Sequence, residues 1–184
     1  MQLDEFTWWC FRYGFSDFLR TKYNFTEEEL AEEFQMWLDY AKTRIPPAYP
    51  GIREIVLEQK RQGGIICVVS HSGQYNILRD YRAHFGIAPD EIYSWDMPEE
   101  TRKPHPYSLL AIMDKYNLQP KDLLVIDDLK PGYDMAKKAG VDFAFAGWGR
   151  KNVPQITEFM QEYCDFSFDD TDRLYRFLFE NRRS

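Results

Sequence analysis

The stretch LLVIDDLKPGYDMAKKAG, Leu123 to Gly140, decides how this chain folds. Four apolar residues, ending at Ile126, are followed at once by two carboxylates, Asp127 and Asp128. This pattern predicts a buried strand with two acids at its C-terminal end, followed by a helix that ends at Gly140. Ligands of open α/β sheets bind at that edge, and adjacent carboxylates repel each other unless a cation lies beside them. We therefore expect Asp127 and Asp128 to hold Mg²⁺, a cation that prefers oxygen ligands, although an isolated Asp pair more often only caps a helix.

Composition limits the possible functions. With 184 residues, of which 44% are hydrophobic, the chain has enough apolar material for one core and a small appended lobe. Its net charge of −7 argues against a nucleic-acid partner and against an anionic membrane surface. The three cysteines are scattered, and we see neither a signal peptide nor an apolar run of membrane length. We therefore expect a cytoplasmic protein without a nucleic-acid or membrane partner.

Residues 1–49 are predicted to form a small α-helical cap. An aromatic-rich helix runs from about Asp4 to Lys22, and a second runs from Thr26 to Lys42, where Thr26 and Glu29 have the spacing of a capping box. The aromatic side chains are expected to pack between these two helices. Clustered prolines in residues 45–51 then form a hinge.

Residues 50–184 are predicted to form an α/β core. Apolar runs alternate with helical patterns, which is typical of a parallel sheet with helices on both faces. The expected strands are 65–69, 92–95, 123–126, 142–146 and one near 166. The expected helices end near 62, 85, 140 and 179, and a further helix is expected after Pro104.

Two further motifs follow strands of this core. The strand ending at Val69 leads into Ser70-His71-Ser72-Gly73, which places a hydroxyl and free backbone amides at the start of a helix and so predicts an anion site. Lys103, before Pro104, is expected at the start of the next helix, from which its ammonium group reaches the same edge. Taken singly, such a serine commonly caps a helix and such a lysine is commonly solvent-exposed.

In this order and spacing, Ser70, Lys103-Pro104-His105-Pro106 and Asp127-Asp128 resemble the motifs of the haloacid dehalogenase-like hydrolase superfamily, in its phosphatase and β-phosphoglucomutase branch. The resemblance implies a Rossmann-like α/β fold with a helical cap. It also implies a Mg²⁺-dependent phosphomonoester phosphatase that acts on a small phosphorylated metabolite. The implied catalytic residues are Ser70, Lys103 and Asp128, the implied phosphate-binding residues are Ser70, His71 and Lys103, and the implied metal ligands are Asp127 and Asp128.

The chain departs from the family at its start. Members begin with a strand that ends in Asp-x-Asp, whose first Asp is the nucleophile, whereas Asp4 is the only early acid here and no apolar run precedes it. Either the sequence begins about one strand too late, or it is a remnant that serves as a non-catalytic binding or assembly module. The DNA upstream of Met1 would distinguish these alternatives. An in-frame apolar run ending in Asp-x-Asp-Gly-Thr would support the first, and a stop codon close before Met1 would support the second.

The missing strand predicts two properties of these 184 residues. Without a nucleophile, the chain as given is expected to be inactive. In the family, the absent strand lies between the strands that end at Ser70 and at Asp127. The gap must be closed by direct pairing of these strands, left to water, or filled by a strand from another chain or from the N-terminal segment. We therefore expect an oligomeric or poorly soluble chain.

Two other protein classes are disfavoured by the sequence. The order of the motifs argues against a receiver domain, and the absence of a Gly-x-Gly-x-x-Gly sequence argues against dinucleotide binding.

Overall fold

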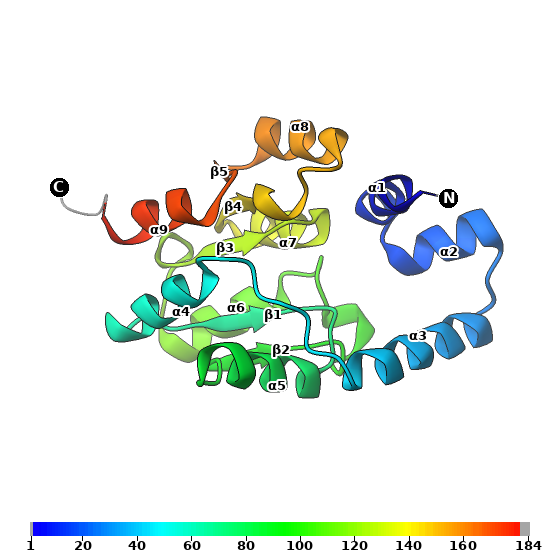
Figure 1. Cartoon of the computed structure of the whole chain (residues 1–184), viewed down its shortest axis with the longest axis horizontal. Helices are drawn as coiled ribbons and strands as arrows, with labels where there is room; N and C mark the ends of the chain where they lie inside the picture. The colour runs from blue at the N-terminus through cyan, green and yellow to red at the C-terminus, as the bar shows by residue number, and fades with distance from the viewer. Residues whose placement is uncertain (1, 181–184) are drawn as a thin grey trace.

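The computed structural model describes residues 2–180 (Figure 1). In chain order, its elements are α1 (Leu3–Tyr13), α2 (Phe15–Tyr23), α3 (Glu27–Lys42), α4 (Ile52–Arg61), β1 (Cys67–Val69), α5 (Gln74–Phe85), β2 (Glu91–Tyr93), the 3₁₀ turn η1 (Glu99–Thr101), α6 (Tyr107–Tyr116), η2 (Pro120–Asp122), β3 (Leu124–Asp127), α7 (Lys130–Ala139), β4 (Asp142–Ala146), η3 (Gly147–Gly149), α8 (Pro154–Tyr163), β5 (Phe166–Phe168) and α9 (Thr171–Phe179). The α/β class predicted from the sequence is confirmed.

The described strands form two parallel sheets, where a single sheet was expected. In one sheet β1 pairs with β2, with Val68 opposite Ile92. In the other, β4 lies between β3 and β5, with Ala144 opposite Ile126. The arrows of β1 and β3 point the same way in Figure 1, so their C-terminal ends face the same side of the molecule.

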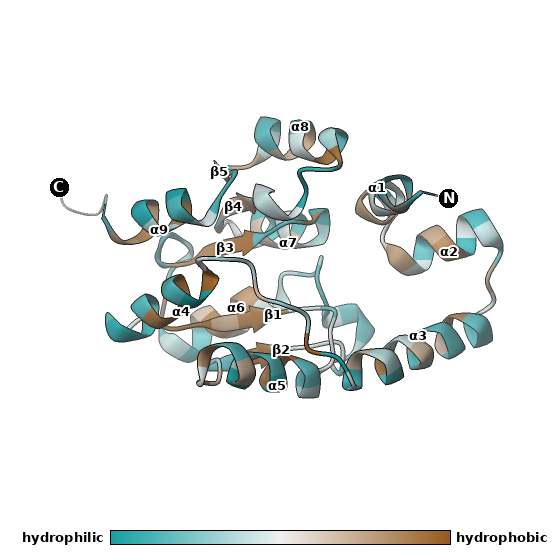
Figure 2. Cartoon of the chain, viewed as in Figure 1, coloured by the Kyte–Doolittle hydropathy of each residue, from teal (hydrophilic) through white to brown (hydrophobic). Residues whose placement is uncertain are grey.

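The core is built around β4. Phe143, Ala144 and Phe145 are 0% exposed because helices cover both faces of this strand. The two phenylalanines pack in a cluster with residues of α6, α7 and α8, while Ala144 packs with residues of α4 and α9. Figure 2 shows the resulting pattern, with hydrophobic strands inside and hydrophilic outer faces on the helices.

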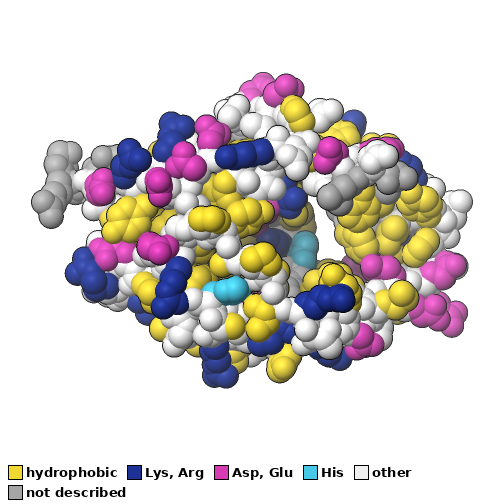
Figure 3. Space-filling view, viewed as in Figure 1, with side chains coloured by type: hydrophobic (Ala, Val, Ile, Leu, Met, Phe, Trp, Pro, Cys, Tyr) yellow, Lys and Arg dark blue, Asp and Glu magenta, His cyan; other side chains and the backbone are white. Residues whose placement is uncertain are grey.

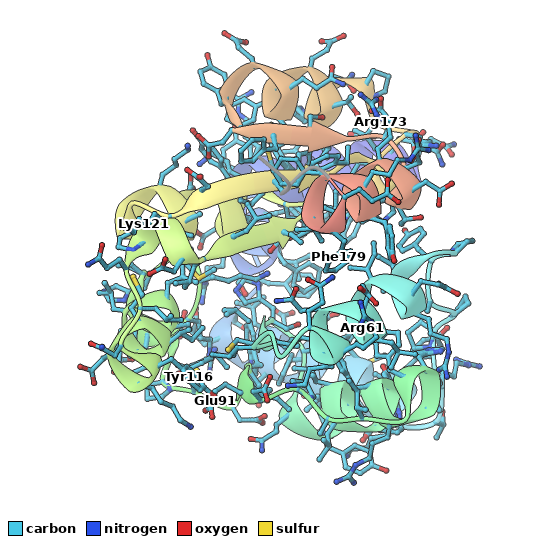
Figure 4. The ribbon with its side chains drawn as sticks, turned by 90° about the vertical axis from the view of Figure 1, so that its left-hand side faces the viewer. Arg61, Glu91, Tyr116, Lys121, Arg173 and Phe179 are labelled. Carbon is cyan, nitrogen blue, oxygen red and sulfur yellow. The ribbon has the colours of Figure 1, made fainter. Side chains whose placement is uncertain are left out.

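The strands that border the division between the sheets are less buried than β4. Every residue of β1 is partly exposed, and Ile126 in β3 is 40% exposed. Parallel strands are normally covered on both faces, so the exposed Ile126 shows that the face of β3 that carries it is not fully covered. The direct pairing of β1 with β3 that would close the gap is not present among the described strands. In Figure 4, turned by 90°, Glu91, the first residue of β2, lies in the lower part of the molecule with Tyr116, and Arg173 of α9 lies in the upper part.

The N-terminal helices differ from the prediction at Gly14. A single helix was expected from Asp4 to Lys22, but the chain bends between α1 and α2 where Gly14 has φ 83° and ψ 158°. Glycine tolerates this positive φ, which residues with a side chain rarely adopt. The capping box of Thr26 and Glu29 at the start of α3 is confirmed.

The aromatic side chains of this region pack differently from the prediction. Instead of packing on α3, those of α1 pack on α2, with the Phe6 and Phe18 rings 5.6 Å apart, and on α8, with the Phe11 and Phe159 rings 5.4 Å apart. None of the residues of α3 is buried. The N-terminal helices thus reach from α8 to the region of α5, and Figure 3 shows an opening between them and the rest of the molecule. The boundary of the cap at residue 49 stays a prediction.

Three smaller differences concern the core. The helix expected to begin at Pro104 begins at Tyr107, the strand expected over 65–69 covers only Cys67–Val69, and α8 was not predicted. None of the helices between residues 2 and 180 is long and apolar enough to cross a membrane.

Candidate active site

Lys103 and Asp127 meet at the C-terminal end of β3. The Nζ atom of Lys103 lies 2.7 Å from Oδ2 of Asp127, and the two side chains are only 11% and 14% exposed. The ammonium group therefore lies beside the acid pair, as expected. Lys103 is placed by the loop after β2, where the ring of His71 lies 2.9 Å from its carbonyl oxygen through Nε2.

The remaining oxygen of Asp127 is also occupied. The backbone N–H groups of Asp128 and Leu129 donate to Oδ1 at 2.7 and 3.1 Å. Burial opposes ionisation, but the charge and hydrogen bond of Lys103 outweigh it, so the pKa of Asp127 is lowered. Gly132 permits this arrangement, because a Cβ atom at that position would come within 2.6 Å of the carboxyl carbon of Asp127. Asp127 is thus a fixed anion that orients Lys103.

Asp128 has a different partner, Arg150. A guanidinium nitrogen of Arg150 lies 2.7 Å from Oδ2 of Asp128, and the side chains are 25% and 32% exposed. Burial raises the pKa of Asp128 and the charge of Asp127 adds to the rise, while Arg150 opposes it. Arg150 was not predicted from the sequence, although it directly follows the Gly147-Trp148-Gly149 turn after β4.

Ser70 directly follows β1, whose C-terminal end faces the same side of the molecule as that of β3. Its Oγ accepts the backbone N–H of Ser72 at 3.0 Å, which leaves its own O–H free to donate to an anion. The residue His71 as a whole is exposed, but its ring packs edge-on against Trp95 at 5.7 Å. Desolvation of the ring lowers the pKa of His71.

The start of α5 differs from the expected anion site. Ser72 does not cap the helix, and the first backbone amide, that of Gln74, donates to Oδ2 of Asp96 at 2.7 Å. One donor that was expected for an anion is therefore already used. Asp96 was not predicted from the sequence, because 22 residues separate it from Gln74 and only the tertiary fold brings them together.

The fit of Mg²⁺ depends on Asp128. Among residues 2–180, no group of three or more His, Cys, Asp or Glu side chains is placed to hold a metal. Mg²⁺, however, keeps several waters and needs only one or two carboxylates together with substrate phosphate. Both oxygens of Asp127 are engaged, whereas Asp128 is held by an ion pair at one oxygen. The donor chemistry fits Mg²⁺ on Asp128, with Asp127 adjacent.

Comparisons with known proteins identify the family of the chain. Residues 16–146 match the family model of the haloacid dehalogenase-like hydrolases. Over 155 residues, the chain is 26% identical to a phosphoglycolate phosphatase of Haemophilus influenzae strain 86-028NP, covering 82% of this chain and 66% of that protein. The chain thus spans just under two thirds of the length of that curated relative.

Solved structures show the same fold. A predicted phosphoglycolate phosphatase from Haemophilus somnus 129PT aligns with a TM-score of 0.67 at 26% identity, covering 84% of this chain and 68% of that one. A mutant of CbbY from Rhodobacter sphaeroides, in complex with xylulose-1,5-bisphosphate, aligns with a TM-score of 0.69 at 18% identity, covering 94% and 80%. The match of the family model over most of the chain identifies this protein as a member of the haloacid dehalogenase-like hydrolase family.

Proposed function

We propose that this chain carries the phosphate-binding and cation-binding parts of a Mg²⁺-dependent phosphomonoester phosphatase. One observation carries the proposal: Lys103 and Asp127, 24 residues apart in sequence, form a largely buried ion pair 2.7 Å long, on the side of the molecule that the C-terminal ends of β1 and β3 both face. A lysine held at this depth supplies a fixed positive charge for a phosphoryl group.

Each proposed role follows from the contacts of the side chain. Ser70 would donate its hydroxyl to one phosphoryl oxygen, because its Oγ already accepts the N–H of Ser72. Lys103 would balance the charge of the phosphoryl group, since Asp127 engages it at one point and an ammonium has three donors. His71 would contact the phosphate as a neutral group and keep Lys103 in place through the carbonyl contact.

Asp128 would hold Mg²⁺, and Asp127 beside it would contribute negative charge. When bound, the cation would neutralise the phosphoryl oxygens. Asp127 supports the site indirectly, because Lys103 and two backbone amides hold its carboxylate in one orientation.

The nucleophile is proposed to come from a strand between β1 and β3. The facing edges of these strands are unpaired within the described part of the chain, and Ile126 is 40% exposed. A strand that ran parallel to both would end between Ser70 and Asp127, next to Lys103. An aspartate at its end would therefore meet a phosphoryl group held by these residues.

We propose a small phosphorylated metabolite as substrate. The curated relatives are named as phosphoglycolate phosphatases, and a small phosphorylated acid is the substrate class that these names support. The acidic net charge of the chain, −7, supports neither a nucleic acid nor an anionic membrane as partner. A cytoplasmic location is proposed because the sequence shows neither a signal peptide nor an apolar run of membrane length.

The test supplies the proposed strand. The chain would be extended at its N-terminus by an apolar strand ending in Asp-x-Asp-Gly-Thr, and hydrolysis of p-nitrophenyl phosphate and 2-phosphoglycolate would be measured with and without Mg²⁺. The extended chain is expected to gain Mg²⁺-dependent turnover that a matched Asn-x-Asn extension lacks and that Asp128→Ala removes. Equal rates for the Asp and Asn extensions, in chains that both fold, would contradict the proposal.

A binding or assembly role is the second candidate, and the same unpaired edges favour it. Unpaired backbone groups along β1 and β3 can accept a strand from another molecule. If so, an added strand peptide without acidic residues would stabilise the chain as well as one that ends in Asp-x-Asp.

A further inference from the structure

Arg150 is the member of the site for which the proposed phosphatase chemistry has no role. Its guanidinium lies 2.7 Å from Oδ2 of Asp128, the carboxylate proposed to hold the cation. The guanidinium thus places a positive charge of the chain beside two adjacent carboxylates, where it offsets the repulsion between them.

The fold holds this contact in place. The backbone N–H of Arg150 donates to the carbonyl of Gly147 at 3.0 Å, and its own carbonyl accepts the N–H of Val153 at 3.0 Å. Gly149 lets the loop lie against the carboxylate, because a Cβ atom there would be only 3.3 Å from Oδ2 of Asp128. Arg150 therefore starts from a fixed backbone position beside Asp128.

The ion pair is nevertheless incomplete. The Nε–H group of Arg150 is buried and has no hydrogen-bond partner within residues 2–180. Strong arginine–carboxylate pairs use two parallel N–H donors, and a buried donor without a partner carries a desolvation penalty. The guanidinium is thus close enough to neutralise Asp128 but is held less firmly than in a bidentate pair.

We propose that Arg150 is an internal counter-cation of Asp128, and that it and a divalent cation exclude each other at this carboxylate. Mg²⁺ binds carboxylate oxygens at about 2.0–2.1 Å. A guanidinium 2.7 Å from the same oxygen would lie within a few ångströms of the ion, and like charges this close repel strongly in a partly buried site. Cation binding must therefore displace Arg150, which weakens the affinity. This inference rests on the proposed cation site at Asp128.

Isothermal titration calorimetry with MgCl₂ on the 184-residue chain tests the inference without any need for turnover. Arg150→Gln is expected to bind Mg²⁺ at least tenfold more tightly than the wild type, and Asp128→Asn is expected to abolish binding in both backgrounds. Lys151→Gln is the matched control, because it removes the same charge from an exposed position one residue along the loop. It should change the affinity by less than twofold.

Arg150→Lys covers the case in which Arg150→Gln does not fold, as judged by circular dichroism. A lysine keeps the charge but is shorter, so its Mg²⁺ affinity is expected to lie above that of the wild type and below that of Arg150→Gln. Unchanged affinity in the folded Arg150 variants, or an equal gain in Lys151→Gln, would overturn the inference. If the Arg150 variants bound Mg²⁺ no more tightly but Asp128→Asn still abolished binding, the proposed cation site would stand and only the role of Arg150 would be wrong. If no variant bound Mg²⁺, both the cation site and the role of Arg150 would be wrong.

Discussion

Lys103 and Asp127 form the least exposed ion pair among the residues that the structure describes, with side chains 11% and 14% exposed. Replacing one partner leaves the other charge buried without compensation. We therefore expect Lys103→Met to lower the free energy of unfolding by about 3–5 kcal/mol, the cost of breaking a buried pair. Urea denaturation measures the change.

The control for this substitution is Lys137→Met. Lys137 also pairs with a carboxylate, that of Asp165 at 2.7 Å, but these side chains are 38% and 31% exposed. Water already solvates such a pair, so its loss is expected to cost about 1 kcal/mol or less. If Lys103→Met cost no more than Lys137→Met, Lys103 would not be the fixed buried charge that the proposed site needs.

Gly132 ties the acid pair to the first turn of α7. Glycine inside a helix is usually less stable than alanine, by about 1 kcal/mol. Here a Cβ atom would approach Cβ of Asp127 to 2.7 Å, so alanine must displace the carboxylate or the turn. We expect Gly132→Ala to destabilise the protein by about 1–3 kcal/mol, as overpacking does. Thermal denaturation measures whether the substitution lowers or raises the stability. A stabilised variant would show that α7 and Asp127 are not packed this closely.

The start of α5 depends on Asp96. The backbone N–H of Gln74 and the hydroxyl of Ser94 both donate to its Oδ2 at 2.7 Å, and they hold the pKa of Asp96 below its usual value. Because the folded pKa lies below the unfolded value of about 3.9, the added stability is complete well above that pH and is lost as the pH falls through the folded pKa.

Asp96→Asn is therefore expected to cost about 0.3–1 kcal/mol at pH 7, the usual value of an acid at a helix N-terminus. Stability measured by urea denaturation from pH 7 to pH 2 should fall less steeply below about pH 4 in the variant than in the wild type. Identical slopes would mean that these hydrogen bonds do not favour the ionised form.

The elements differ in how far the sequence could predict them. The strand before Asp127 and the capping box at Thr26 depend on local patterns, and the structure confirms both. The break at Gly14 lies within a continuous helical pattern, and only its positive φ shows it. Arg150 and Asp96 were missed because their partners, Asp128 and Gln74, lie 22 residues away in sequence in each case and meet them only in the folded chain.

At the scale of the whole molecule, the division into two sheets leaves the neighbouring edges of β1 and β3 unpaired within the described residues. Unpaired strand edges promote association with other chains. We expect the 184-residue chain to sediment as oligomers, and a strand peptide that fills the gap should shift it toward the monomer. A monodisperse monomer that unfolds cooperatively above about 60 °C, high for a mesophilic domain, would contradict this expectation.

The most direct measurement is the rate of p-nitrophenyl phosphate hydrolysis by the 184-residue chain and by its Asp128→Ala variant, both with Mg²⁺. We propose that Ser70, Lys103 and Asp128 bind and position a phosphoryl group and that the attacking carboxylate lies on a further strand between β1 and β3. We therefore expect equal rates, at the level of the uncatalysed reaction. Mg²⁺-dependent turnover that Asp128→Ala abolishes would contradict it, because the nucleophile would then belong to the chain itself.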